Sequence, residues 1–149
     1  MANVTHQYAA SNAFGAGPTP RGTDRLRTES FVLDIGTDNL GVGDLWKFCR
    51  FNSRTIIHSV RLEVTDLDSD GSPALTLDVG YDLASGTDDD DFWLGNSTIG
   101  QAGGAANSTA EAFAPGEDFT LQAKVEAAAA TAQAGRAVLT VEFGSIENA

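Results

Sequence analysis

Three aspartates at alternate positions, Asp66, Asp68 and Asp70, are followed directly by Gly71. Carboxylate oxygens are the ligands that Ca²⁺ prefers in proteins, and alternate side chains in a tight loop can turn toward one ion. The glycine permits the sharp turn that such a loop needs. The motif therefore makes Asp66, Asp68 and Asp70 candidate calcium ligands.

The motif opens like an EF-hand loop but departs from that loop further on. Its twelfth position is Leu77, where an EF-hand has a bidentate glutamate, and its flanking residues alternate as strands do. Two interpretations follow: a calcium site of another type, or an acidic turn whose Asp side chains accept hydrogen bonds from their own backbone. We expect no other cofactor.

Four consecutive aspartates, Asp88–Asp91, precede Phe92 and Trp93. Like charges repel one another, so these side chains stay on the surface unless a cation or an arginine meets them. The run is either a docking point for a basic partner or a solvated turn before a strand.

Catalytic groups are sparse in this sequence. A catalytic triad requires a nucleophile, a base and an orienting acid that converge in space. His58 falls on the apolar face of an alternating segment, which favours a core or interface histidine. Cys49 follows Phe48 in an apolar segment, and a free cysteine in such a place is usually a small buried side chain. The glycine-rich stretch 100–104 lacks the Lys-Ser/Thr of a phosphate-binding loop. We therefore expect no catalytic residues and no enzyme.

The chain has two tryptophans, Trp46 and Trp93. An exposed tryptophan would give a sugar ring a stacking platform, whereas a tryptophan beside Leu and Phe is typical of a core. Core positions are favoured for both side chains. Carbohydrate binding stays an alternative that requires at least one of them to be exposed.

From residue 29 on, apolar and polar residues alternate with a period of two, and this alternation predicts the elements that position these groups. In segment 56–65, for example, Ile56, His58 and Val60 fall on the inward face, while Ile57 and Ser59 fall on the outward face. Such alternation predicts half-buried strands. Strands are expected at 31–35, 45–51, 56–65, 75–83, 92–94, 110–113, 119–125 and 137–143.

Segments rich in Gly, Asp, Ser and Pro separate these strands, including a flexible loop over 100–107. Many short strands punctuated by turns predict an all-β sandwich or barrel. The alanine-rich segment 127–134 favours a helix by composition. Because it is too short for a stable isolated helix, we expect a loose hairpin connection, with at most one helical turn.

Residues 1–28 show neither the period of 2 that is typical of strands nor the period of 3.6 that is typical of helices. They are predicted to form an N-terminal arm, with the folded domain over 29–149. The arm is too small and polar to bury a core of its own. It is therefore either a frayed terminus or a segment that orders against a partner. Its candidate contact residues are Tyr8, Phe14, Arg21, Arg25 and Arg27.

Composition excludes several classes of protein. A chain of 149 residues fits one domain, and its net charge of −12 argues against nucleic acid and anionic membrane as partners. The charge is uneven: residues 1–61 hold seven bases and five acids, and residues 62–149 hold two bases and sixteen acids. The single Cys49 excludes an internal disulfide. We expect no transmembrane helix and no signal peptide.

The order of segments carries a family resemblance. Segment 55–68 is followed by 74–81, by Asp88–Phe92, by a small-residue segment through Gly100–Gly104, and by a final hairpin of 119–125 and 135–143. Over about residues 29–144 this order resembles the small structural proteins of tailed bacteriophages, which include head decoration (cement) proteins and minor virion proteins.

The resemblance implies an antiparallel β-sandwich of jelly-roll type with no catalytic activity. Such a protein would bind the outer capsid surface as a homotrimer and staple neighbouring subunits of the major capsid protein. Assembly in the host cytoplasm would suit a chain with one free cysteine. A head fibre, tail or connector position is the alternative within the virion. A glycan-binding β-sandwich module is the alternative of a different class, because jelly rolls also occur in lectin domains.

Overall fold

The structure is a computed structural model that describes residues 3–5 and 26–146. Its 3-10 helices are η1 (Thr37–Asn39) and η2 (Ile99–Gln101). Its strands are β1 (Asn3–Thr5), β2 (Arg27–Ile35), β3 (Leu45–Phe51), β4 (Thr55–Val64), β5 (Thr76–Leu83), β6 (Asp88–Ser97), β7 (Gly104–Asn107), β8 (Phe119–Ala127) and β9 (Gly135–Ser145).

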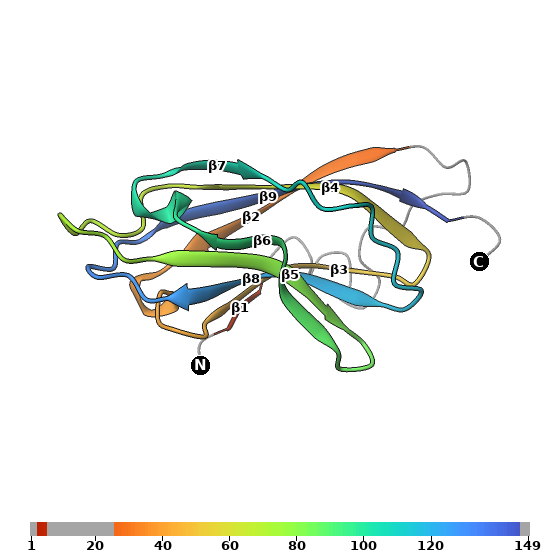
Figure 1. The fold of residues 1–149 in the computed structure, drawn as a ribbon, viewed down its shortest axis with the longest axis horizontal. Helices are drawn as coiled ribbons and strands as arrows, with labels where there is room; N and C mark the ends of the chain where they lie inside the picture. Colours follow the sequence, from red (N-terminus) through yellow and green to blue (C-terminus); the bar gives the residue numbers. More distant parts are fainter. Residues whose placement is uncertain (1–2, 6–25, 147–149) are drawn as a thin grey trace.

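The strands form two sheets that pack as layers, which confirms the all-β sandwich (Figure 1). One sheet has the strand order β1-β3-β8-β5-β6 and the other the order β2-β9-β4-β7. Apart from the short parallel pairing of β1 with β3, the named strands pair antiparallel. Consecutive strands from β2 to β9 alternate between the sheets, except for β5 and β6. This order supports the jelly-roll type, which stays an interpretation.

Alternating apolar residues from both sheets fill the space between the layers. Phe51 of β3 is buried in this core, and its ring centroid lies 5.6 Å from that of Phe119 and 5.0 Å from that of Phe143. Phe119 belongs to the same sheet as Phe51, whereas Phe143 belongs to the opposite sheet. These aromatic contacts therefore join the two layers directly.

The inward face predicted for the first half of β4 is wrong. A register shift between Ile57 and Ser59 inserts an extra residue opposite β9, so the alternation changes face at this bulge. Ile57 is buried and His58 is exposed, whereas Val60 points inward as expected. The bulge coincides with a backbone bridge in which Ile57 and Phe113 exchange N–H···O bonds of 2.8 and 2.9 Å.

Two segments expected to be irregular form strands. The run Asp88–Asp91 begins β6 instead of preceding a strand, and the predicted loop over 100–107 contains the end of η2 and the edge strand β7. The expected hairpin connection at 127–134 is irregular and contains no helix. Both 3-10 helices of the described ranges are three residues long, and neither is long and apolar enough to cross a membrane.

Candidate interaction surface

Most of the predicted arm contacts lie outside the described residues: Tyr8, Phe14, Arg21 and Arg25. Arg27 lies within β2 and not before it. Its Nη2 is 3.0 Å from Glu29 Oε1, and its guanidinium lies 5.7 Å from the centroid of the Phe143 ring. Arg27 thus contacts its own sheet, and its proposed role toward a partner stays a prediction.

The predicted calcium loop forms a hydrogen-bonded clasp around Asp68. This side chain is only 1% exposed. Its two carboxylate oxygens accept backbone N–H bonds of 2.8 Å from Ala74, 3.1 Å from Leu75, 2.9 Å from Ala130 and 2.9 Å from Thr131. Asp68 therefore ties its own turn to the distant connection between β8 and β9.

The neighbouring aspartates accept hydrogen bonds two residues ahead. Asp66 Oδ1 accepts from the N–H of Asp68 at 3.1 Å, and Asp70 Oδ1 accepts from the N–H of Ser72 at 2.8 Å. These bonds confirm the interpretation as an acidic turn. Within residues 3–5 and 26–146, no three His, Cys, Asp or Glu side chains are placed to hold a metal ion. Calcium binding stays a prediction.

The electrostatics of Asp68 follow from this clasp. Burial opposes ionisation of the carboxyl group, but the N–H dipoles of Thr131, Ala130, Ala74 and Leu75 outweigh it and hold the pKa well below its usual range. The carboxylate is therefore charged at neutral pH, with its charge balanced by backbone dipoles.

The residues considered for chemistry lie in different environments. Cys49 is completely buried, and burial, with a smaller contribution from Glu29, raises the pKa of its thiol far above its usual value. A thiol of this kind is not a nucleophile at neutral pH. His58 is exposed, which rules out the core position; the interface position stays a prediction.

Both tryptophans belong to the core, as favoured from their neighbours. Trp46 is 0% exposed and Trp93 is 5% exposed. The Trp46 indole N–H donates a 2.9 Å hydrogen bond to the Asn39 carbonyl oxygen. The exposed stacking platform that carbohydrate binding required is therefore missing at both positions.

The aspartate run folds over the outer face of the five-stranded sheet. Tyr81 pairs with Asp89 and Val79 pairs with Leu94, so β6 has three more residues than β5 between these pairs. The backbone of Asp89 and Asp90 in β6 lies directly against Gly80 of β5. A Cβ added at Gly80 would overlap the Asp89 carbonyl oxygen and lie 2.7 Å from the Asp90 Cα. A glycine is therefore required for this close approach.

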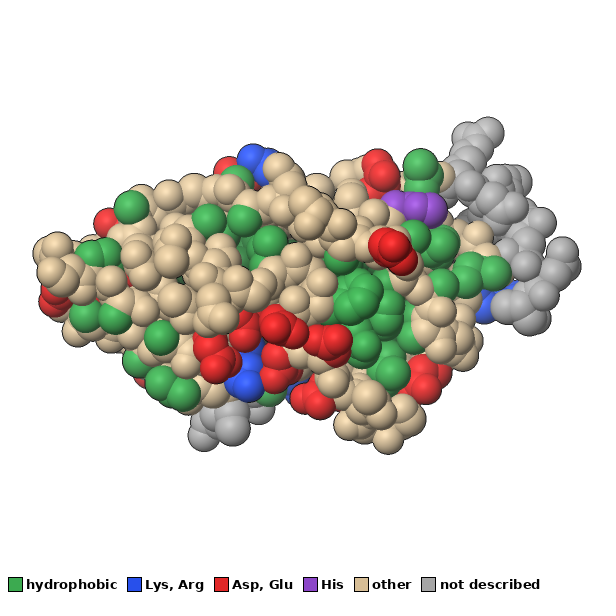
Figure 2. Space-filling view, in the orientation of Figure 1, with side chains coloured by type: hydrophobic (Ala, Val, Ile, Leu, Met, Phe, Trp, Pro, Cys, Tyr) green, Lys and Arg blue, Asp and Glu red, His purple; other side chains and the backbone are tan. Residues whose placement is uncertain are grey.

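This fold-over gathers carboxylates into what we call the acidic surface: Asp78, Asp88, Asp89, Asp90, Asp91 and Glu126, with Lys124 among them. Lys124 Nζ donates a 2.8 Å hydrogen bond to Asp90 Oδ2 and lies 3.9 Å from Glu126 Oε2. Figure 2 shows acidic side chains gathered around a basic one on the visible face.

Crowding changes the proton affinity of the acidic surface. Burial raises the pKa of Asp78; the N–H of Asn96, bonded at 2.6 Å, opposes the shift, and Glu126 and Asp91 add to it. Burial and a hydrogen bond with Asp91 likewise raise the pKa of Asp89. Lys124 compensates only part of the repulsion. A cationic partner would therefore be favoured at this surface.

An aromatic cluster that the sequence did not predict closes the sandwich edge. Phe113, between β7 and β8, stacks on Tyr81 with a centroid distance of 4.3 Å. Its ring also lies 5.0 Å from Phe92, 5.4 Å from Trp93 and 5.5 Å from Phe119. Tyr81, Phe92 and Phe113 are half-buried, so the cluster reaches the surface. Figure 2 shows a hydrophobic patch beside the acidic side chains.

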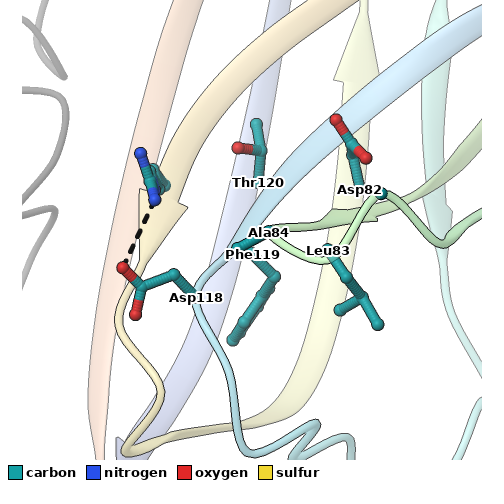
Figure 3. A pocket seen from close by; sticks show the side chains of 8 residues that line it. Asp82, Leu83, Ala84, Asp118, Phe119 and Thr120 are labelled. Carbon is teal, nitrogen blue, oxygen red and sulfur yellow. Dashed lines mark hydrogen bonds and ion pairs between the residues drawn. The ribbon is translucent and has the colours of Figure 1, made fainter.

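A hollow of about 350 Å³ lies near the tip of the β5–β6 hairpin. Asp118 Oδ2 accepts a 3.3 Å hydrogen bond from Arg50, and Asp118 Oδ1 accepts one of 3.0 Å from the N–H of Ser53. Figure 3 shows Asp118 turned toward this guanidinium, while Asp82 and Thr120 lie on the other side of the hollow. Because Asp118 already neutralises Arg50, we assign this ion pair a role in anchoring the chain.

The comparisons with known proteins bear on the fold. No family model matches the sequence, and neither does any curated protein. A chain in the capsid structure of Ralstonia phage GP4 has a TM-score of 0.76 and 22% identity, over 99% of this chain and 100% of that chain. A chain of the cyanophage Pam1 capsid asymmetric unit gives 0.68 and 20%, over 86% and 91%.

A third similar structure is the acid-stable capsid of Helicobacter pylori bacteriophage KHP30, with a TM-score of 0.51 and 16% identity over 86% of this chain and 92% of that chain. The protein is thus a β-sandwich that shares its fold with chains of phage capsid structures. The resemblance to phage structural proteins is confirmed at the level of the fold.

Proposed function

We propose that this chain is a non-enzymatic structural protein of a phage virion, which binds the outer capsid surface as a decoration or cement protein. The observation that carries the proposal is the end-to-end match with a chain of the phage GP4 capsid structure. That chain is about as long as this one, so the match extends over a whole small subunit.

The described surface supports binding to another protein. An aromatic group next to a charged rim is the usual anatomy of a protein interface. Here Tyr81, Phe92 and Phe113 supply the aromatic group, and the acidic surface supplies the charge. We propose the major capsid protein as the partner, with this chain stapling neighbouring subunits. The buried Cys49 thiol supports a role without catalysis.

We further propose that the protein is a homotrimer and that Tyr8, Phe14, Arg21, Arg25 and Arg27 contact the capsid. Three linked copies would gain avidity from contacts that are individually weak. Light scattering tests the assembly: a mass of three times 15.5 kDa supports the trimer, and a monomer mass contradicts it. A trimer that dissociates only with chelator would instead support a calcium ion at the Asp66–Asp70 loop.

The capsid role is tested by cosedimentation with empty capsids of the phage that encodes the chain. We expect saturable binding at a fixed ratio to the capsid protein. A variant with Tyr8, Phe14, Arg21 and Arg25 all changed to Ala should fold normally but bind more weakly. Protein that stays in the supernatant contradicts the proposal. Protein that sediments only with purified tails or head fibres assigns it to another part of the virion.

A further inference from the structure

A small pocket of about 170 Å³ opens at the acidic surface. Its lining residues are Gly43, Leu45, Asp88, Asp90, Gln122 and Lys124. At about 30 Å³ of liquid volume per molecule, this space equals the volume of about six waters, so it has room for the planar end of a side chain. The lining combines carboxylates and an amide with the apolar side chain of Leu45.

Gln122 is the group in this pocket that the fold leaves incomplete. It alternates with the core residues of β8 and so lies on the outer face, yet it is only 3% exposed because β6 folds over this face. Its Oε1 is buried and has no hydrogen-bond partner. A buried amide oxygen without a donor is unfavourable, so a ligand that supplies an N–H would be stabilised here.

The charge around the pocket specifies the ligand. Asp88 and Asp90 line it, and the other carboxylates of the acidic surface surround it. Two lysines oppose them: Lys124 is paired with Asp90, and Lys47 lies opposite Gln122 in the neighbouring strand. The net potential is negative, which favours a cation that also donates several hydrogen bonds.

We propose that this pocket is a socket for an arginine side chain of the partner protein. The planar guanidinium donates five N–H groups in a fixed fork, which suits an amide oxygen and a carboxylate presented together. Its methylene stem packs on Leu45. This inference rests on the proposed function, because the partner that would carry the arginine is the capsid protein.

The test uses the full chain and Nα-acetyl-L-arginine methylamide as the probe, followed by ¹⁵N–¹H NMR. We expect a dissociation constant on the order of millimolar. The Gln122 side-chain amide and the Asp88 backbone amide should shift. The citrulline analogue, which has the same shape without the charge, should cause no such shifts. Equal shifts with both probes, or shifts centred elsewhere, overturn the socket.

Two variants separate binding from folding. Gln122→Leu and Asp88→Asn should each raise the dissociation constant by about tenfold, the loss expected for one hydrogen bond to a charged group. Asp34→Asn, at a carboxylate 88% exposed on the other sheet, should leave it unchanged. Equal affinity in Asp88→Asn and wild type would refute the socket, because this exposed position tolerates substitution without loss of the fold.

The socket and the capsid role fail in different ways. Arginine binding at Gln122 by a protein that ignores capsids would keep the socket and refute the proposed function. Capsid binding that is unchanged in both Gln122→Leu and Asp88→Asn would keep the function and refute the socket as part of it.

Discussion

The carboxylate of Asp68 accepts a hydrogen bond of 2.9 Å from the backbone N–H of Thr131, although 63 residues separate them along the chain. The same side chain accepts from Ala74 and Leu75, which lie just beyond its own turn. One carboxylate thereby fixes two loops at the same end of the sandwich. Its alternating neighbours Asp66 and Asp70 cap local turns.

Asp68→Asn should destabilise the fold by about 3 kcal/mol. The amide would place an NH₂ group against backbone N–H groups whose hydrogen bonds the carboxylate now accepts. Chemical denaturation measures the free energy of unfolding. Asp34→Asn, at an exposed carboxylate, is the matched control and should change it by less than about 0.5 kcal/mol. Wild-type stability that falls with chelator and is restored by calcium, with Asp68→Asn insensitive to both, would show that the loop binds metal.

Stability should pass through a maximum in mild acid. The pKa of Asp68 is lowered on folding. Its contribution to the free energy of unfolding is therefore fully present above the unfolded pKa of about 3.9 and is lost as pH falls below it. The pKa values of Asp78 and Asp89 are raised, so just above pH ~4 the folded state binds more protons than the unfolded state. The free energy of unfolding therefore falls as pH rises through the pKa values of the folded state.

Denaturation between about pH 3 and pH 8 measures this profile. Asp89→Asn should remove part of the fall on the neutral side and stabilise the protein at neutral pH by roughly 0.5 kcal/mol, as for other surface charge pairs. Its behaviour below pH ~4 should match wild type, because Asp68 is untouched. Wild-type stability that rises steadily from mild acid to neutral pH would contradict this account of the acidic surface.

Gly80→Ala tests the crossing of β6 over the sheet. The new methyl group would overlap the Asp89 carbonyl oxygen, so β6 must move, at a cost of about 1–3 kcal/mol. Movement of β6 would also expose the buried Gln122, which hydrogen exchange of its side-chain amide would detect. Gly71→Ala is the control, since its Cβ would meet nothing within 4 Å. Equal stability of the two variants would refute the crossing.

Phe113→Ala should remove the centre of the aromatic cluster. We expect a loss of about 2 kcal/mol, less than for a fully buried phenylalanine because Phe113 is half-buried. Trp93, whose ring centroid is 5.4 Å from that of Phe113, should emit at longer wavelength and become easier to quench. Unchanged tryptophan emission would show that Phe113 does not shield the core.

The strands could be predicted where alternation is simple, and not where distant contacts set the register. Segments 119–125 and 137–143 alternate strictly and lie in β8 and β9. The β4 bulge, in contrast, coincides with a bridge between Ile57 and Phe113, which no local pattern reveals. Strand β7 is four small or polar residues at a sheet edge, so it has no hydrophobic alternation to detect.

The candidate surface was predictable in part. The aspartate run indicates either a docking point or a solvated turn, and its charge is plain from composition. Its crossing over Gly80 depends on a long bulge between β5 and β6, which sequence spacing does not show. The aromatic cluster brings Tyr81, Phe92 and Phe113 together from three segments, so only the folded chain reveals it.

Cryo-electron microscopy of the virion of the phage that encodes this chain tests the central claim most directly. We predict density for the two-layered sandwich on the outside of the capsid, with its acidic surface or aromatic cluster against the capsid protein and copies grouped in threes. A capsid without this density, or the same density found only in the tail, would contradict the decoration role.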